Sequence, residues 1–253
     1  AEFKIKKLLH YADLFSCDKI ATGHYARIEN SQLQIAKDSW KDQSFMLYRL
    51  TKKQKERLIL PLGEMMKDEV KDFVRQRGYT EIANKRESFG LCFTNGLHYS
   101  EYLLNQYPQL KKLENGKVIN ENNQLIGSHK GFPFYTIGQY KGMNINEKLY
   151  INKIIAEENT LVVGEKSQCY FSTLRLNSLV FSQEIENIKI ETPYLTKIRG
   201  KDEGNYSILK EISPNHATIE FNQKVFAPMQ GQDVVLYDEN NFILFGGRIE
   251  SFN

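Results

Sequence analysis

ATGHYARI, residues 21–28, is the stretch that decides the fold class of this chain. The preceding CDKI (17–20) is typical of the end of a short buried strand, and the pattern over residues 25–36 predicts a hairpin. Gly23 and His24 therefore lie where one strand ends and a hairpin begins. Because α/β folds place ligands at the carboxyl ends of strands, this turn either binds a ligand or simply reverses the chain.

The segments around this stretch alternate between helix and strand patterns. Apolar residues in 3–16 fall on one face of a predicted helix. Thr51 is placed to cap a helix over KKQKERLI (52–59), and another helix opens at Lys67 and stops at Gly78. This alternation through about residue 85 predicts an α/β domain.

The pattern changes after about residue 95. HYSEYLLNQY (98–107) predicts one helix, and hairpins are predicted over 117–127 and 149–165. The Gly- and aromatic-rich stretch 127–143 between them predicts an ordered loop or an irregular strand. From about residue 170 short strands follow one another at regular spacing, which predicts a small antiparallel barrel or sandwich.

Composition excludes some classes of protein. Hydrophobic residues make up 41% and charged residues 26% of the 253, as in ordinary soluble globular proteins, and no apolar run is long enough for a transmembrane helix. Residues 1–169 hold 26 Lys and Arg against 20 Asp and Glu, whereas residues 170–253 hold 8 against 11. The basic clusters of the first part either meet phosphates or form solvated helix faces.

Three cysteines, far apart in the chain, predict a reducing cytoplasm and no structural zinc site. Cys92 stands in RESFGLCFTNG (86–96), a loop in which Lys85 and Arg86 would lower the pKa of its thiol. The alternative is a small buried side chain. A cysteine hydrolase would need His98 or His129 beside this thiol.

Asp42 stands in SWKDQSFMLYRL, next to Trp40, the only tryptophan. It is either a helix N-cap or part of a polar group in which Lys41 and Gln43 contact a phosphate or a base edge. No glycine-rich phosphate loop of either common type occurs in the chain. The nucleotide cradle that such a loop would provide is therefore missing.

Taken together, ATGHYARI, KDQSFMLYRL, ESFGLCF, HKGFPFYTIGQYKGM and the final GQDVVLYD and FGGRIE resemble the tRNA-specific 2-thiouridylases, over essentially all 253 residues. Enzymes of this family use ATP to replace the C2 oxygen of the wobble uridine of tRNA by sulfur. The resemblance implies ATP with Mg²⁺, the tRNA anticodon stem-loop and a persulfide sulfur-donor protein as partners. It also implies a cytoplasmic monomer without a membrane partner.

The same resemblance implies an α/β plus β architecture. Residues 1–95 would be the tail of an adenine-nucleotide α-hydrolase-like (PP-loop) catalytic domain, 96–168 a small central domain, and 169–253 a C-terminal antiparallel β-barrel that binds tRNA.

The resemblance also implies roles for individual residues. Cys92 matches the cysteine that carries sulfur as a persulfide, and Gly23 matches a nucleotide contact. The residues that match tRNA contacts are His24, Lys41, Asp42, Gln43, Arg199, Gly200 and Gln232. At position 200 the family often has an aromatic residue, so glycine weakens that contact. No residue matches a metal ligand.

Two family features are absent from the printed sequence. There is no Ser-Gly-Gly-x-Asp-Ser pyrophosphate loop, and the first catalytic cysteine, which with the second would form a disulfide after sulfur release, would precede Ala1. We therefore expect the C-terminal two-thirds of the enzyme, inactive by itself. The main alternative is a non-catalytic tRNA-binding paralogue. An RNA methyltransferase lacks support, since no glycine-rich strand-turn for a methyl donor is present.

Overall fold

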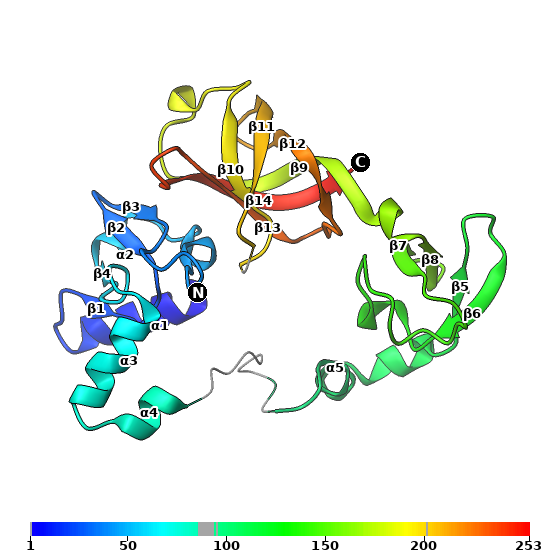
Figure 1. Cartoon of the computed structure of the whole chain (residues 1–253), viewed down its shortest axis with the longest axis horizontal. Helices are drawn as coiled ribbons and strands as arrows, with labels where there is room; N and C mark the ends of the chain where they lie inside the picture. Colours follow the sequence, from blue (N-terminus) through cyan, green and yellow to red (C-terminus); the bar gives the residue numbers. More distant parts are fainter. Residues whose placement is uncertain (1, 86–93, 95, 201) are drawn as a thin grey trace. The chain divides into compact units, whose positions relative to one another are not determined.

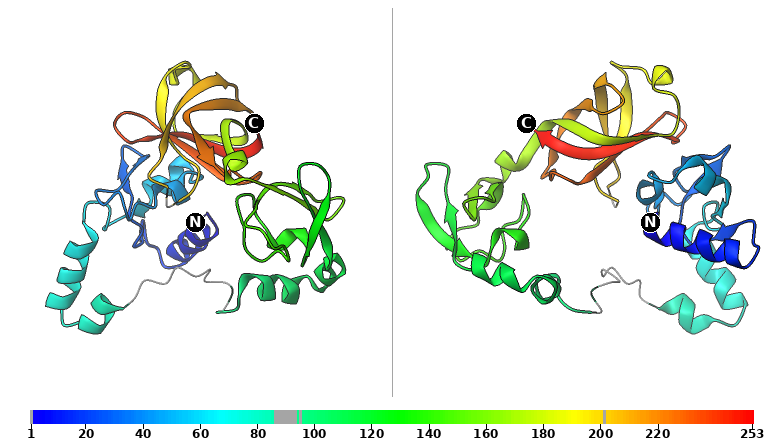
Figure 2. Two further views of the ribbon diagram at one scale, coloured as in Figure 1. Left: turned by 45° about the vertical axis from the view of Figure 1, so that its right-hand side comes forward. Right: turned by 180° about the vertical axis from the view of Figure 1, so that it is seen from behind.

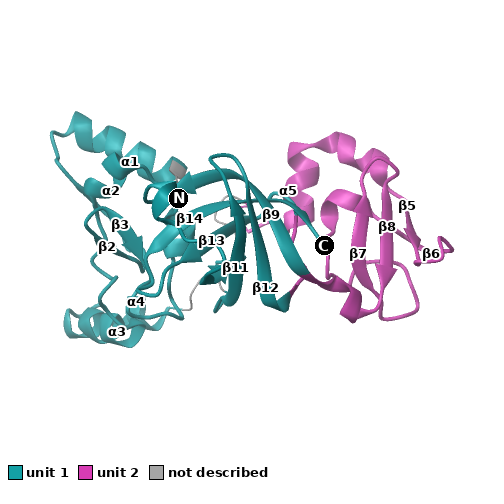
Figure 3. Ribbon diagram, turned by 90° about the horizontal axis from the view of Figure 1, so that it is seen from above, with its two compact units in different colours: residues 1–85, 172–224, 230–253 teal, residues 86–171, 225–229 magenta. Residues whose placement is uncertain are grey.

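The computed structural model describes every residue except 1, 86–93, 95 and 201. By packing, the chain forms two compact units, coloured separately in Figure 3. The first unit comprises residues 1–85, 172–224 and 230–253, and the second comprises 86–171 and 225–229. Among the described residues, no helix combines the length and the apolar character that crossing a bilayer requires.

The amino-terminal part of the first unit mixes short strands and helices, as its sequence predicts (Figure 1). Its elements are α1 (Glu2–Leu14), β1 (Ile20–Ala21), β2 (Arg27–Glu29), β3 (Gln32–Gln34), η1 (Ser44–Leu47), α2 (Lys52–Glu56), β4 (Leu58–Ile59), α3 (Lys67–Gln76) and α4 (Thr80–Asn84). Strands β1 and β4 pair in parallel, Ile20 opposite Leu58, although β2, β3 and α2 intervene in the chain.

The structure confirms the predicted start of α2 and the predicted stop after α3. The prediction that the helix beginning at Lys52 runs to residue 59 is wrong, because α2 ends at Glu56 and Leu58–Ile59 pair with β1 as strand β4. Thr51 Oγ1 accepts a hydrogen bond from Gln54 N (3.3 Å), and Gln54 Oε1 accepts one from Thr51 N (2.9 Å), which forms a capping box at the start of α2. Gly78 follows α3 with φ of +85°, the left-handed conformation that ends helices and that glycine adopts without strain.

The hairpin predicted after ATGHYARI is also present. Strands β2 and β3 pair antiparallel around Asn30 and Ser31, both of which have positive φ, as the tight turns of two-residue hairpins require. Beyond β3 the chain meets a second hairpin from the far end of the sequence. Ile35 N donates to Asn241 O (3.0 Å), and Gln34 Nε2 donates to Asn240 O (2.7 Å).

The carboxy-terminal strands close into an antiparallel barrel, which confirms the predicted barrel. They are β9 (Tyr170–Phe181), β10 (Pro193–Lys197), β11 (Asn205–Ile212), β12 (Ala217–Phe226), β13 (Asp233–Tyr237) and β14 (Ile243–Phe252), in the order β10-β11-β12-β9-β14-β13. Pairing of β13 back to β10, with Leu195 opposite Tyr237, closes the ring. Figure 2 shows these strands, yellow to red with a green-yellow β9, from two further directions.

One hydrophobic core joins the amino-terminal segment to the barrel. Ile5, Leu33 and Leu47 from the first segment cluster with Val235 and Tyr237 of the barrel, and all five side chains are fully buried. Each such side chain contributes about 1.5–3 kcal/mol on burial. The boundaries 1–95, 96–168 and 169–253 stay a prediction, but the first and last of these segments pack as one body.

The second compact unit is built on a four-stranded sheet in the order β6-β5-β8-β7, which contains both predicted hairpins. Its elements are α5 (Tyr99–Gln106), η2 (Pro108–Leu113), β5 (Gly116–Ile119), β6 (Leu125–His129), η3 (Phe132–Phe134), β7 (Tyr150–Ile155), β8 (Thr160–Gly164) and η4 (Lys166–Cys169). A further 3₁₀ turn, η5 (Ile185–Asn187), belongs to the first unit.

Candidate functional site

Thr22, Gly23 and His24 follow β1 directly, at the shared carboxyl end of the parallel pair β1 and β4. Thr22 N donates to Ile59 O (3.1 Å), so the ladder extends one residue beyond the strands. Gly23 is exposed, and a Cβ atom at this position would lie 3.7 Å from Leu62 Cδ1, an ordinary contact. The chain itself therefore does not require glycine here, and close approach of a ligand stays the predicted reason for it.

His24 is held by its own turn. Its Nδ1 lies 2.9 Å from Thr22 Oγ1, and the imidazole is half-buried. Burial lowers the pKa of His24, and the positive charge of Lys4 lowers it further. The ring is therefore neutral at neutral pH, so any contact with RNA would use hydrogen bonds and not charge.

The second motif stretch is bound to the first through Gln43. Gln43 N donates to Tyr25 O (2.7 Å), and Gln43 Oε1 accepts from Tyr25 N (3.1 Å). Residues 24–25 and 41–43 are thus brought together, although 18 positions separate Tyr25 from Gln43. The NH₂ group of Gln43 forms no hydrogen bond with another residue that the structure describes.

Asp42 lies in the interior of the first unit, with its side chain only 1% exposed. Its Oδ1 accepts from Ala36 N and Ser44 N, both at 3.1 Å. Its Oδ2 accepts from Ser44 Oγ (2.8 Å) and from Lys197 Nζ (2.9 Å) on β10 of the barrel. Because the carboxylate is fully occupied within the chain, it cannot contact tRNA in this arrangement, and we assign Asp42 a positioning role.

A barrel tyrosine completes this buried network. Tyr237 Oη lies 3.1 Å from Ser44 Oγ, and the Lys197 ammonium lies 5.5 Å from the Tyr237 ring centroid. Burial raises the pKa of Tyr237, and the charge of Asp42 raises it further, so the phenol keeps its proton. Since Ser44 donates its only hydroxyl proton to Asp42, Tyr237 must donate to Ser44. Sequence patterns gave no signal for Lys197 or Tyr237.

The barrel loop that holds Arg199 and Gly200 reaches the same place. Arg199 is exposed. A Cβ atom at Gly200 would lie 2.9 Å from Met46 Cε and 3.6 Å from Phe45 Cδ1, both on η1, which directly follows Gln43. A larger residue at position 200 would therefore have to displace the flexible end of Met46.

Gln232 lies in the turn before β13, and its Oε1 is buried without a hydrogen-bond partner among the described residues. Its neighbour Asp233 binds the segment after η1, since Asp233 Oδ1 accepts from Tyr48 Oη (2.8 Å) and Arg49 Nη2 (3.3 Å). Burial raises the pKa of Tyr48, and the hydrogen bond to Asp233 raises it further. Arg49 Nε is likewise buried without a partner among these residues. Asp233, Tyr48 and Arg49 thus form a second polar cluster, which the sequence patterns did not predict.

Cys92 lies outside the described residues. The two cysteines that are described, Cys17 and Cys169, are both free. Of the histidines a hydrolase would need, His98 caps α5 through a hydrogen bond from Ser100 N (3.4 Å). His129 is buried, its Nδ1 accepts from Gly131 N (3.0 Å), and its Nε2 donates to Asn159 O (3.1 Å). Both of its nitrogens are occupied, which disfavours it as a general base.

The described residues fit only part of an ATP site. Gly23, exposed at the carboxyl end of two parallel strands, is placed for a nucleotide contact. The described residues contain neither a glycine-rich phosphate cradle nor a group of three His, Cys, Asp or Glu side chains that would hold a metal ion. The Mg²⁺ and phosphate contacts of the predicted cofactor therefore cannot be assigned to them.

These features define a protein that combines an α/β segment, of the kind found in nucleotide-binding domains, with a β-barrel. Comparison with known proteins agrees with this architecture. A family model described as "tRNA methyl transferase HUP domain" matches residues 1–96, and one described as "tRNA methyl transferase PRC-barrel domain" matches 102–165.

Curated relatives give a more specific identification. A tRNA-specific 2-thiouridylase MnmA of Cytophaga hutchinsonii is 34% identical over 256 residues, covering 98% of this chain and 69% of the relative. A protein of the same name from Chlorobium phaeobacteroides (strain BS1) is also 34% identical, and the match covers 99% of this chain and 71% of the relative. An MnmA 3 from Bacteroides fragilis is 34% identical as well, and the match covers 98% of this chain and 70% of the relative. The chain belongs to the tRNA-specific 2-thiouridylase family.

Proposed function

We propose that this chain takes part in the ATP-dependent 2-thiolation of the wobble uridine of tRNA, and that its first compact unit binds the tRNA. The observation that carries the proposal is the convergence of Lys41–Gln43 with the barrel loop 199–200. These segments are more than 150 positions apart, yet the buried Asp42–Lys197 ion pair (2.9 Å) holds them together. His24 joins them through the Tyr25–Gln43 hydrogen bonds.

The chemistry we propose depends on Cys92. The terminal sulfur of a Cys92 persulfide bonds to C2 of the uridine, and the C2–O bond breaks. ATP supplies the adenylyl group that makes this oxygen a good leaving group, so AMP departs with it. A second thiol then attacks the Cys92 sulfur, which frees 2-thiouridine and leaves a disulfide. The persulfide is an effective nucleophile at neutral pH because S–H groups ionise readily.

The residues around the target have separate roles in this proposal. Lys41 and Arg199 contact phosphates, and His24 and the NH₂ group of Gln43 donate or accept hydrogen bonds. Gln232 contacts tRNA from the turn before β13 of the barrel. Gly23 contacts the nucleotide, with no side chain to obstruct it. The wobble base must leave the anticodon stack to react, as single-stranded RNA bases commonly do in complexes.

Replacing Cys92 by serine at the native locus tests the enzymatic part. We expect 2-thiouridine to disappear from cellular tRNA, measured by mass spectrometry, while the purified variant binds tRNA as the wild type does. Serine has nearly the size of cysteine but cannot carry a persulfide. Wild-type levels of 2-thiouridine in this strain would contradict the assignment.

The alternative, a tRNA-binding module without catalysis, rests on the absence of a Ser-Gly-Gly-x-Asp-Ser stretch from the 253 residues. Incubating the purified chain with ATP, Mg²⁺, tRNA and a persulfide donor separates the two functions. We infer that this chain alone binds tRNA but forms no 2-thiouridine. A persulfide-carrying donor protein, a monomeric state and a cytoplasmic location complete the proposal. The free thiols of Cys17 and Cys169 fit a reducing compartment.

A further inference from the structure

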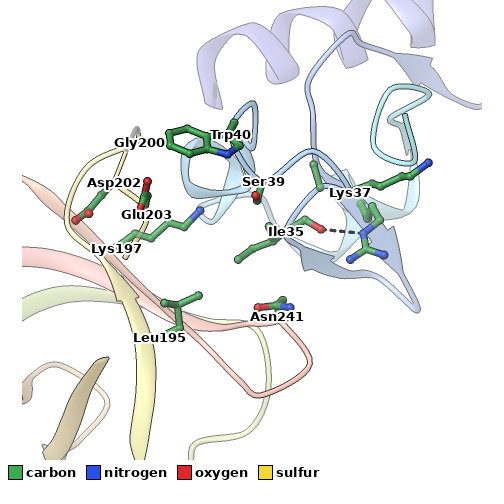
Figure 4. Close-up of a pocket in the computed structure, with 12 residues that line it drawn as sticks. Ile35, Lys37, Ser39, Trp40, Leu195, Lys197, Gly200, Asp202, Glu203 and Asn241 are labelled. Carbon is green, nitrogen blue, oxygen red and sulfur yellow. Dashed lines mark hydrogen bonds between the residues drawn. The ribbon is translucent and has the colours of Figure 1, made fainter. Parts of the chain in front are cut away.

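A cavity of about 670 Å³ opens in the first compact unit beside the proposed tRNA contacts (Figure 4). One wall is formed by the loop that precedes Asp42, including Trp40, and the other by the barrel segment that carries Leu195, Gly200 and Glu203. Its volume lies in the range of small-molecule sites, which is ample for one nucleobase with its ribose. Gly200 contributes no side chain to fill it.

Trp40 provides a large aromatic surface at this cavity. It is the only tryptophan in the chain, and 81% of it is exposed. A single exposed aromatic residue is common on proteins, but this one lines a cavity and lies next to Lys41. Unpaired RNA bases stack on such rings, and the indole loses little freedom when they do.

The backbone that carries Trp40 is fixed before any ligand arrives. Lys41 N donates to Asp38 O (3.1 Å), and Asp38 Oδ2 accepts from Lys67 N (2.9 Å) on α3. Two residues beyond Trp40, the Asp42 carboxylate joins the buried network. Because this backbone is already held, only the side chain of Trp40 has to be ordered on binding, which lowers the entropic penalty.

The opposite wall offers a free carboxylate. Asp202 is engaged by its own turn, since it accepts from Gly204 N (3.1 Å) and Ile198 N (3.4 Å). Glu203 is exposed and forms no hydrogen bond or ion pair with another described residue. A carboxylate accepts hydrogen bonds from the amino groups of cytosine, adenine or guanine, whereas uracil offers it only a ring N–H between two carbonyl oxygens that repel it.

We propose that this cavity holds an unstacked tRNA base bearing an amino group, stacked on Trp40 and read by Glu203. The proposal rests on the proposed function, because it needs tRNA on this face. It assigns a second base pocket, separate from the reaction at the wobble uridine.

The single tryptophan makes the site directly observable. Stacking on a base quenches indole fluorescence, so tRNA should quench Trp40 and saturate at the concentration at which labelled tRNA binds by anisotropy. Binding without a change in Trp40 fluorescence would overturn the cavity assignment and leave the proposed function intact. Absence of binding in the anisotropy assay would overturn both.

Two variants test the stacking surface itself. Because one stacked base is worth about 1–3 kcal/mol, Trp40→Ala should weaken tRNA binding by roughly 5- to 150-fold, and Trp40→Phe should restore most of it. Trp40 is exposed, so its loss should not unfold the chain. Phe15→Ala removes another exposed aromatic residue, 75% exposed and not part of this cavity's lining, and should leave affinity unchanged. Equal affinity of Trp40→Ala and wild type would overturn the proposal.

Glu203 is tested with oligocytidine and oligouridine of twelve nucleotides, which carry the same phosphate charge. Wild type should bind oligocytidine more tightly and show stronger Trp40 quenching with it. Glu203→Gln should lose this preference, because its amide accepts and donates equally well. Equal binding of both oligomers by wild type, or quenching by neither, would overturn the assignment of the base.

Discussion

Replacing Lys197 by methionine should destabilise the first compact unit strongly. Lys197 and Asp42 have side-chain exposures of 4% and 1%, and Lys197 Nζ lies 2.9 Å from Asp42 Oδ2. Methionine matches the length and the apolar stem of lysine but removes the ammonium. The Asp42 carboxylate would then remain buried without a counter-charge, which typically lowers the free energy of unfolding by about 3–5 kcal/mol.

A double-mutant cycle separates the ion pair from other effects of substitution. Asp42→Asn keeps an oxygen for Ala36 N and Ser44 N but leaves Lys197 unpaired, so it should lose a similar amount. The double variant has no buried charge, so it should recover part of this loss and be more stable than either single variant. The cycle should then give a coupling free energy of at least about 3 kcal/mol between the two residues.

Urea unfolding followed by far-ultraviolet circular dichroism measures these values. With a slope near 2 kcal/mol per molar urea, the midpoint of Lys197→Met should fall by about 1.5–2.5 M. Lys210→Met is the matched control, because Lys210 pairs with Glu191 at 3.0 Å on the exposed surface of the barrel, and its midpoint should stay near wild type. A Lys197→Met midpoint equal to that of this control would refute the buried ion pair.

Three further predictions concern other parts of the chain. Burial lowers the pKa of His129, so the unfolded state binds more protons below pH 6.5, and stability should fall as pH decreases from 7.5 to 5.5, measured by urea midpoints. Gly246→Ala should destabilise the barrel by about 1–3 kcal/mol in urea unfolding, because its Cβ would overlap the Tyr48 ring and lie 2.9 Å from Val234 O. Lys41→Glu should weaken tRNA binding, and the slope of log affinity against log salt should decrease by about one to two.

Each of these outcomes has its own control. The pH dependence should be shallower in His129→Gln, and an unchanged slope would assign it to other groups. Gly23→Ala is the control for Gly246→Ala, because Gly23, like Gly246, has no positive φ and its Cβ would meet only Leu62 Cδ1, at 3.7 Å, so the urea midpoint should stay near wild type. Equal affinity of Lys41→Glu and wild type at every salt concentration would remove Lys41 from the phosphate contacts.

The fold was largely predictable because its local signals agree with its tertiary packing. Thr51 and Gly78 mark helix ends through hydrogen bonds and backbone conformations within a few residues of themselves. The first part of β12 alternates buried and exposed positions, whereas β13 and the first half of β14 are buried almost continuously, so it was the regular spacing of short strands between turns that predicted the barrel. Closure of the barrel and its docking on residues 33–48 depend on contacts between distant segments, which periodicity does not encode.

The candidate site residues came from motif stretches, and their roles in binding stay predictions. Hydrogen bonds between Tyr25 and Gln43 bring the stretch that contains His24 next to the one that contains Lys41. Lys197 and Tyr237 escaped prediction because each resembles an ordinary strand residue, and only the fold places it against Asp42. For Asp42 the motif leaves a helix N-cap and a surface contact open; the structure makes Gln43 the N-cap of η1 and places the Asp42 carboxylate against Lys197, a partner that only the fold supplies.

The burial of Asp42 explains how one triplet can serve both the interior and the surface. A buried ion pair is weak evidence for stability, because apolar residues of similar volume often pack as well or better. Its hydrogen bonds, however, are directional. The carboxylate meets Ala36 N, Ser44 N and Lys197 Nζ in one geometry only, so it fixes the loop between residues 36 and 44 against the barrel. An apolar side chain would permit the loop to slide, whereas this pair sets the direction in which its neighbours point. Orientation of the neighbouring Lys41 and Gln43, more than stability, is therefore what the buried charge provides.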